Sequence, residues 1–307
     1  MDLRTTSGES QGTVNIRRGR SVRAPCPRRP FSLLREPVKR KLAFLLGTFV
    51  TGAATGQETR RIEDNSFLLE EAYNQEAGVV QHISTFAKPR GSGEWGYALT
   101  TEWPLTGQRH QLSYTLSLVR AETASGLATG LGDVAINYRL QAIGGENARF
   151  WLAPRITAIV PVGSADLGRG NGRLGLEVGI PASMTLAPWL TGHFNVGLTG
   201  YPGASGAGRI GTTARAARVG GSLIVDLSPK INLLVETLFE SRRVVSGFGA
   251  TAVAESWVVN PGVRWAFDFA SGLQIVPGVA YTIGAGPSKG EDGLFLYLSF
   301  EYSFKKQ

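Results

Sequence analysis

The sequence is poor in the residues that usually carry redox or metal chemistry. It has one cysteine, Cys26, and three histidines, His82, His110 and His193. A single cysteine excludes an internal disulfide framework and a cysteine-ligated zinc site, and the scattered histidines have no metal-ligand spacing. No run of eighteen apolar residues is present, so no transmembrane helix is expected. We therefore expect no metal, no cofactor and no enzyme activity.

Net positive charge is also missing from most of the chain, although the whole protein carries a net charge of +8. Residues 1–56 contain 11 Lys and Arg against 3 Asp and Glu, whereas residues 57–307 contain 21 of each kind. The excess is confined to the start of the chain. A nucleic-acid partner for the remaining residues is therefore not expected.

Residues 38–56 have the pattern of a secretory signal peptide. Three basic residues, Lys39–Lys41, precede a short apolar core, Leu42–Val50. Ala54 and Gly56 then provide small residues at positions −3 and −1 of a cleavage site. A buried or amphipathic helix is the competing interpretation.

The stretch before the signal peptide, residues 1–37, is rich in Arg and Pro and has no apolar period, so we expect it to be disordered. It is best explained as an upstream extension from a misplaced start, with the true start near Val38. Cys26 lies in this extension. The mature chain is then expected to contain no cysteine.

Strand patterns recur about every twenty residues from Val79 onward, with apolar and polar side chains alternating. Most span ten to fourteen residues, against about five or six in a typical globular strand. The twelve predicted strands are Val79–Ala87, Glu94–Leu105, Gln108–Arg120, Leu131–Ala142, Ala148–Pro161, Arg173–Thr185, Trp189–Tyr201, Thr213–Asp226, Ile231–Ser241, Glu255–Asp268, Leu273–Thr282 and Gly293–Phe304.

The predicted connections alternate in length. Those after even-numbered strands are short, as in LAP and LSPK, whereas the others include Val162–Gly172, Pro202–Thr212 and Arg242–Ala254. Short turns at one end, long loops at the other and an even number of strands are typical of outer-membrane barrels. The sequence thus predicts an all-β fold, a transmembrane antiparallel up-and-down β-barrel over residues 79–304. A soluble sandwich gives no reason for this sorting of the loops.

Aromatic residues support the same fold. Trp95 and Trp103 are eight residues apart, as are Trp257 and Trp265. Eight residues span roughly 26 Å of strand, or roughly 20 Å of height at a tilt of about 40°. We therefore predict two aromatic girdles, with Trp95 and Trp257 at the outer rim. The inner rim contains Trp103, Trp265, Tyr302 and Phe304.

Two stretches resemble a known family: NSFLLEEAYNQEAGVVQHI (Asn65–Ile83) and GDVAINYRLQ (Gly132–Gln141). They are similar to an uncharacterised group of bacterial outer-membrane barrels labelled transporter-like, or likened to a component of the MetA pathway of phenol degradation. The resemblance implies a barrel in the cell outer membrane. It provides no catalytic or binding residues. The final Phe304 also resembles the C-terminal aromatic that outer-membrane assembly machinery recognises, although a short tail, residues 305–307, follows it.

The polar faces of the strands should line the lumen. The charged residues on these faces are Glu102, Asp133, Arg139, Arg155, Arg173, Glu177, Glu236, Arg264 and Glu301. Arg155 is expected to lie diagonal to both Asp133 and Glu177, within reach of long side chains. This predicts a charged row, Asp133–Arg155–Glu177. The row either balances charge inside the barrel or selects solutes at a constriction.

Residues 57–78 precede the first strand and could act in the periplasm or as a plug in the lumen. Within them, Arg61–Glu76 could form a short helix, with Asn65 or Ser66 as its cap. A plain periplasmic linker is the alternative.

We interpret the protein as a monomeric outer-membrane channel for passive diffusion of small solutes. By the family resemblance, these solutes would be apolar or aromatic. The partners expected are the lipid bilayer, the assembly machinery and a small-molecule solute. A non-conducting structural or binding barrel with a closed lumen is the first alternative. An outer-membrane hydrolase is the second, but no serine–histidine motif is apparent in the sequence.

Overall fold

The computed structural model describes residues 62, 64–123, 125–145, 147–206, 209–247 and 250–304. The predicted upstream extension, signal peptide and C-terminal tail lie outside these residues. No helix among the described residues is long and apolar enough to cross a membrane.

The described part of the chain contains fifteen strand segments and two short 3-10 helices. The first eight segments are β1 (Val79–Pro89), β2 (Trp95–Pro104), β3 (His110–Thr123), β4 (Gly126–Leu131), β5 (Val134–Leu140), β6 (Phe150–Leu152), β7 (Arg155–Val160) and β8 (Gly175–Ala187). The others are β9 (Leu190–Gly206), β10 (Arg209–Ser228), β11 (Ile231–Gly247), β12 (Ala250–Trp265), β13 (Phe267–Asp268), β14 (Gln274–Gly284) and β15 (Gly293–Ser303). The 3-10 helices are η1 (Ala165–Leu167) and η2 (Gly286–Ser288).

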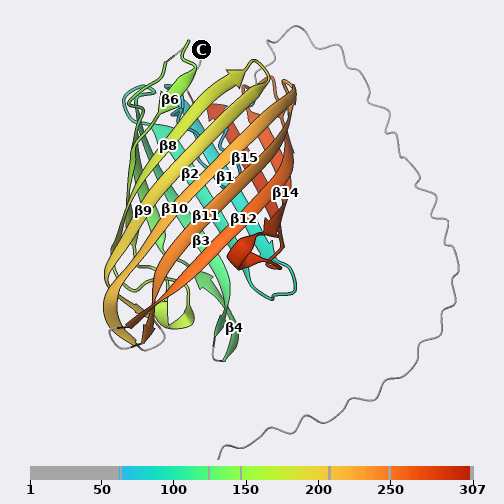
Figure 1. The fold of residues 1–307 in the computed structure, drawn as a ribbon. Coiled ribbons are helices and arrows are strands. Elements are labelled where there is room, and N and C mark those ends of the chain that lie inside the picture. Colours follow the sequence, from blue (N-terminus) through green and yellow to red (C-terminus); the bar gives the residue numbers. More distant parts are fainter. Residues whose placement is uncertain are drawn as a thin grey trace, which may run out of the picture. The chain divides into compact units, whose positions relative to one another are not determined.

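These segments build one closed antiparallel barrel (Figure 1). Three pairs of segments, β4 with β5, β6 with β7 and β12 with β13, continue one another along the same neighbour, so the described segments form twelve strands. The ring closes where β1 pairs with β15, from Val79 opposite Ser303 to Pro89 opposite Gly293. Closure leaves no free sheet edge, and the predicted fold class is confirmed.

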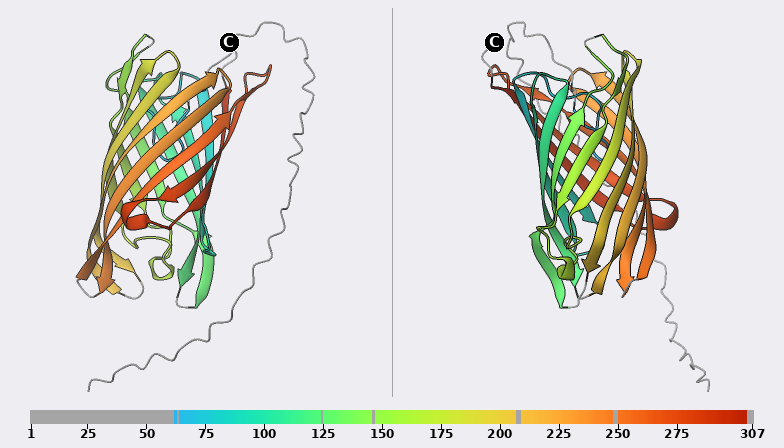
Figure 2. Two further views of the ribbon diagram at one scale, coloured as in Figure 1. Left: turned by 45° about the vertical axis from the view of Figure 1, so that its right-hand side comes forward. Right: turned by 90° about the vertical axis from the view of Figure 1, so that its left-hand side faces the viewer.

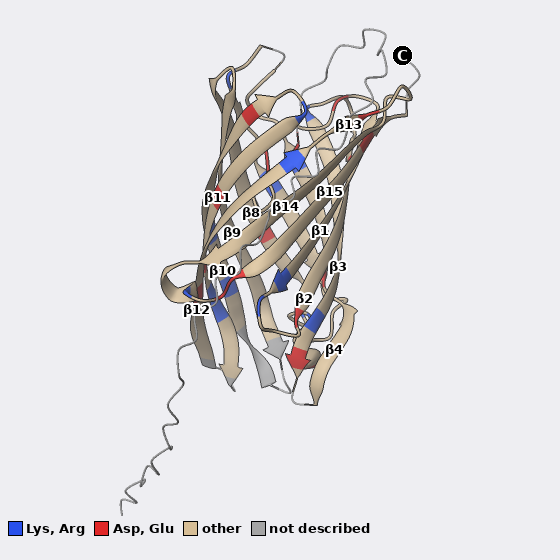
Figure 3. Cartoon of the chain, turned by 90° about the vertical axis from the view of Figure 1, so that its right-hand side faces the viewer, with Lys and Arg blue, Asp and Glu red and all other residues tan. Residues whose placement is uncertain are grey.

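Side chains alternate between the outer surface and the lumen, as the period of two requires. On β8, Leu176, Val178 and Ile180 are exposed, whereas Glu177 between them is buried. Charged residues occupy scattered positions on otherwise neutral strands (Figure 3). An apolar outside around a polar inside reverses the arrangement of a water-soluble protein. It is the arrangement of a barrel surrounded by lipid.

Two of the predicted long loops are instead extensions of hairpins, and in this respect the loop prediction was wrong. Strand β9 continues to Gly206 and β10 already begins at Arg209. In the same way, β11 continues to Gly247 and β12 begins at Ala250. The backbone groups of these extensions pair with each other, as at Val244 opposite Ala252. The extensions project from the end of the barrel opposite to the end of β15 (Figure 2). The predicted loop at residues 162–172 remains a connection, with η1 inside it.

Candidate functional site

The described residues just before β1 lie inside the barrel. Residues 64–75, called here the inner segment, contain no helix or strand. A turn at Ala77–Gly78 leads from them into β1, and Gly78 adopts a φ of 88°, which favours glycine. The predicted helix over Arg61–Glu76 is therefore not found in its described residues. Several backbone N–H groups of the inner segment donate to side chains of the barrel wall, so they are not available to helical carbonyl groups.

From Leu68 to Asn74, every second residue of the inner segment donates its backbone N–H to the inner wall. The donors are the backbone N–H groups of residues 68, 70, 72 and 74, at 2.8–2.9 Å from their acceptors. The acceptors are side-chain oxygens of Glu236 on β11, Asn195 on β9, Ser183 on β8 and Gln141 after β5. Side chains of the wall thus take the place that a neighbouring strand would have for an extended peptide.

Gln81 on β1 joins the two ends of the inner segment. Its side-chain oxygen accepts from the Gln75 amide at 2.7 Å, and its own amide donates to the Asp64 carboxylate at 2.7 Å. Between these ends, successive contacts lie on β3, β5, β8, β9, β11 and β12. The inner segment therefore runs around the inner wall and narrows the lumen.

Apolar contacts of Phe67 anchor one part of the inner segment. The Phe67 ring lies 5.7 Å from the Phe295 ring and 5.2 Å from the Tyr297 ring, between centroids. The backbones of Gly262 and Gly278 approach the same ring so closely that a Cβ atom at either would lie 2.5–2.6 Å from it. Because Gly262 on β12 and Gly278 on β14 have no side chains, there is space for the Phe67 ring.

A charged cluster surrounds Glu70 of the inner segment. The Glu70 carboxylate forms an ion pair with Arg155 on β7 and lies 3.8 Å from Arg139 on β5 and 4.0 Å from Arg218 on β10. Glu177 on β8 also pairs with Arg155, and with Arg218 at 2.6 Å. Burial opposes ionisation of Glu70, but the three guanidinium groups outweigh it and hold the pKa of this carboxyl below its ordinary value.

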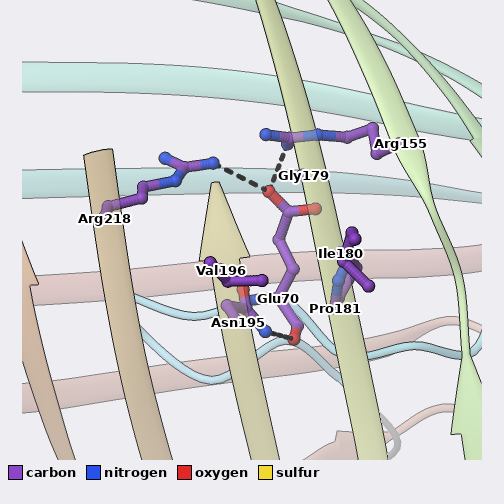
Figure 4. Close-up of a pocket in the computed structure, with 8 residues that line it drawn as sticks. All are labelled: Glu70, Arg155, Gly179, Ile180, Pro181, Asn195, Val196 and Arg218. Atoms are coloured by element: carbon purple, nitrogen blue, oxygen red, sulfur yellow. Dashed lines mark hydrogen bonds and ion pairs between the residues drawn. The ribbon is translucent and has the colours of Figure 1, made fainter. Parts of the chain in front are cut away.

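Two small cavities border Glu70. One, of about 10 Å³, lies where Glu70, Arg155, Asn195 and Arg218 meet (Figure 4). The other, of about 60 Å³, is larger than a single water requires. Its lining residues are Glu70, Thr100, Glu102, Gln111, Ser113, Thr115, Asn137, Arg139 and Arg155. The space beside the cluster is therefore lined mainly by groups that form hydrogen bonds.

Most of the charged residues predicted to line the lumen are buried within the barrel: Glu102, Arg139, Glu177, Glu236, Arg264 and Glu301. The Arg155 side chain is 12% exposed. Arg264 donates to the backbone oxygen of Asp64 at 3.0 Å, so it holds the inner segment as well. Arg173 lies at the loop end of the barrel, where it donates to the Gly203 carbonyl.

The predicted row Asp133–Arg155–Glu177 is only partly present. Arg155 and Glu177 pair as diagonal neighbours, because Arg155 is opposite Gly179. Asp133 lies outside the row, since Arg139 is the residue opposite Arg155. The Asp133 carboxylate instead accepts from backbone N–H groups in the loop after β7, at 3.0 Å each. The expected register between the fourth and fifth strands was wrong. Asp133 lies just before β5, six residues from Arg139, the residue that is opposite Arg155.

The predicted girdle residues lie on the outside of the strands to different degrees. Trp257, Tyr302 and Phe304 are 43%, 39% and 56% exposed, and Trp95, Trp103 and Trp265 are half-buried. Trp257 is not at the end of its strand, since β12 begins at Ala250, and its indole donates to Thr237 at 2.8 Å. The depth at which these rings meet the membrane stays a prediction.

Several residues of the cluster were not predicted from the sequence. Arg218 lies on the same side of β10 as the buried Ser222, so the alternation of β10 indicates that it points inward. Asn195 likewise lies on the same side of β9 as the buried His193. Glu70 has no such signal, and nothing local indicates that it is the hydrogen-bonded partner of Asn195, 125 positions away.

A serine–histidine pair was not predicted from the sequence either. The Ser183 hydroxyl lies 2.7 Å from Nδ1 of His193, opposite it on β9. Ser183 additionally accepts from the Ala72 backbone, and the Tyr73 ring lies against the imidazole. Within the described ranges, no third group orients the histidine through its other nitrogen. Among the same residues, no group of three or more His, Cys, Asp or Glu could hold a metal ion.

Comparison with solved structures supports the fold. No family model matches the chain, and no curated protein matches it. An outer membrane channel from Pseudomonas putida F1 is 15% identical, covers 76% of this chain and 98% of its own, and has a TM-score of 0.56. The NanC porin is 9% identical over 74% of this chain and 100% of its own, with a TM-score of 0.48. The KdgM porin is 7% identical over 74% of this chain and 99% of its own, with a TM-score of 0.42. The closed twelve-stranded barrel, with its apolar outside, is an outer-membrane fold, and the chain is an outer-membrane β-barrel protein.

Proposed function

We propose that the protein is a channel that lets small solutes diffuse across the outer membrane. The observation that carries this proposal is the polar wall of the lumen. Charged, amide and hydroxyl side chains point inward from strands all around the barrel, such as Gln111 on β3, Asn137 on β5 and Asn260 on β12. A barrel that served only to be stable would gain more from an apolar interior, because each buried polar group must be matched by a partner.

The inner segment is the natural regulator of such a channel. It takes up much of the lumen at the end where β1 begins, so a solute passes most readily when the segment moves or leaves. Its hold consists largely of hydrogen bonds and ion pairs to the wall, which water can replace at low net cost. The solute class suggested by the family resemblance, apolar or aromatic molecules, is the finer part of this proposal.

A closed barrel with a structural or binding role is the second candidate. The hydrogen bonds of Gln81 favour this candidate, because they hold both ends of the inner segment to the same side chain. Hydrolysis is a third candidate, supported by the Ser183–His193 hydrogen bond alone. Loss of hydrolysis on ester substrates in Ser183→Ala would be needed to favour it.

Reconstitution of the full chain in planar bilayers tests the proposal. We expect discrete conductance steps. In a second assay, liposomes that contain the protein should swell in sugars, amino acids or aromatic acids. A matched variant, with the inner segment replaced by a Gly/Ser linker of equal length, should give larger steps. If neither protein gives conductance or swelling, although heat-modifiable mobility in gel electrophoresis shows that both barrels are folded, the closed barrel is favoured.

A further inference from the structure

We propose that Arg139, Arg155 and Arg218 form a subsite for a solute carboxylate, and that Glu70 occupies this subsite while the inner segment is in place. The inference rests on the proposed channel function and names the chemical class of its solute. Glu70 thus acts as an internal competitor, and a small organic acid takes its position during passage.

The position of Glu70 is controlled through its backbone. Asn195 accepts from the Glu70 N–H at 2.8 Å and donates its own amide to the Glu70 carbonyl at 2.8 Å. This two-bond clamp leaves the side chain free to extend toward the guanidinium groups, as Figure 4 shows for Arg155 and Arg218. The carboxylate is therefore presented to the cluster in a defined orientation.

The three arginines come from β5, β7 and β10, yet they converge on one carboxylate. Guanidinium groups bind carboxylates through charge-assisted hydrogen bonds, often two at once. The Arg155 Nε atom is buried and has no hydrogen-bond partner among the described residues. The cluster thus has a donor to spare for a ligand whose shape differs from that of Glu70.

Charge balance indicates that the ligand is an anion. The wall contributes three guanidinium groups and two carboxylates to the cluster, those of Glu177 and of Glu102, which lies 3.6 Å from Arg139. Without Glu70, the wall retains one uncompensated positive charge in a largely buried place. Leaving such a charge unpaired is costly, so displacement of Glu70 creates a site that favours another anion.

Space for a ligand exists next to the cluster. The cavity of about 60 Å³ reaches from Glu70 to Thr100, Ser113 and Asn137, and Arg139 and Arg155 both border it. Hydroxyl and amide groups at these positions can bind the polar atoms of a small acid. Removal of Glu70 would enlarge the same space, so the subsite and the opening of the lumen are coupled.

Liposome swelling with two solutes of nearly equal shape tests the inference. The probes are sodium benzoate, a carboxylate, and benzamide, its neutral analogue. In Glu70→Gln, the ratio of benzoate to benzamide uptake should rise by about tenfold, the effect expected for one charge-assisted contact. The ratio should return to the wild-type level in the double variant E70Q/R218Q. Reversal potentials in a KCl gradient should shift toward anion selectivity in E70Q alone.

Glu76→Gln is the matched control, because Glu76 is exposed and six positions farther along the same stretch. It removes the same charge without touching the cluster and should behave as wild type. Equal gains for benzoate and benzamide in E70Q, or no gain for either, would overturn the carboxylate subsite while the channel itself stands. Absence of uptake and conductance in wild type and all variants, with folded barrels, would reject the channel and the subsite together.

Discussion

The carboxylate of Glu70 forms an ion pair with the guanidinium of Arg155, 85 positions later in the chain. One partner belongs to a segment without regular structure, and the other to a strand of the barrel wall. The pair therefore connects the inner segment to the barrel wall. Whatever weakens the hold of the wall on this segment should widen the lumen, and the predictions below follow from that relation.

Gly278→Ala should loosen the inner segment. A Cβ atom there would lie 2.6 Å from the Phe67 ring, so the ring must leave its place between Gly262 and Gly278. Overpacking of this kind costs about 1–3 kcal/mol, and here the strain falls on the anchor of the inner segment. Single-channel recording should show larger or more frequent conductance steps.

Gly96→Ala provides the control, since no atom lies within 4 Å of a Cβ at that position on β2. It adds the same methyl group to the same type of barrel and should leave conductance unchanged. Indistinguishable recordings from the two variants would mean that the Phe67 anchor does not limit the pore.

Val235→Arg should destabilise the barrel because it places a charge against lipid. Val235 is 44% exposed on β11, midway between Phe239, which is opposite Trp257, and Ile231, which is opposite Trp265. An arginine at the bilayer midplane costs about 2–4 kcal/mol, and near an interface about 0–1 kcal/mol. Urea unfolding in lipid vesicles should show the larger loss for V235R. It should show little loss for Leu227→Arg, at the end of β10. Similar losses at the two positions would place the membrane at a different height on the barrel.

Conductance should increase with pH, and Glu71→Gln should reduce this increase. Glu71 lies on the inner segment, outside the strands, and burial raises its pKa well above the ordinary value. The carboxylates of Asp64 and Glu102 raise this pKa further, and Arg139 and Arg264 oppose them. Its contribution to holding the segment is therefore complete below about pH 4.5 and is lost as pH rises through the raised pKa.

The contribution of Glu70 to holding the segment depends on pH in the opposite direction, because it is lost as pH falls through the pKa of this carboxyl. Since this pKa is lowered from 4.5, the loss occurs only at more acidic pH. Among the acids of the inner segment, Glu71 and Asp64 are the ones whose pKa is raised by burial, so their titration lies above that acidic range. A steeper pH dependence in E71Q than in wild type would contradict this explanation.

The barrel could be predicted because its signals are local. Alternation on β8 or β15 is written in consecutive residues, and strand length reflects the thickness of the membrane. The ends of hairpins were harder, because pairing such as Val244 with Ala252 depends on backbone groups that any residue has. The register of Arg139 opposite Arg155 depends on the geometry of the turn between them, which periodicity does not encode.

The inner segment was the least predictable part. Its polar residues suggested a capped helix, but the wall offers acceptors to its backbone that a helix could not use. Ser66 meets Ser222, 156 positions away, and Arg264 meets Asp64, 200 positions away. Only the closed ring brings such partners together, so the cluster around Glu70 follows from tertiary structure and not from any motif.

A disulfide between the inner segment and the wall tests the central claim most directly. The hydroxyl oxygens of Ser66 and Ser222 are 2.8 Å apart, so Ser66→Cys and Ser222→Cys should form a bond under oxidation, in a chain whose Cys26 is also changed to serine. Single-channel conductance should be low when this pair is oxidised and should increase on reduction, while each single-cysteine variant should not respond. Equal conductance in the oxidised and reduced states, with the cross-link verified by mass spectrometry, would show that solutes pass without any movement of the inner segment.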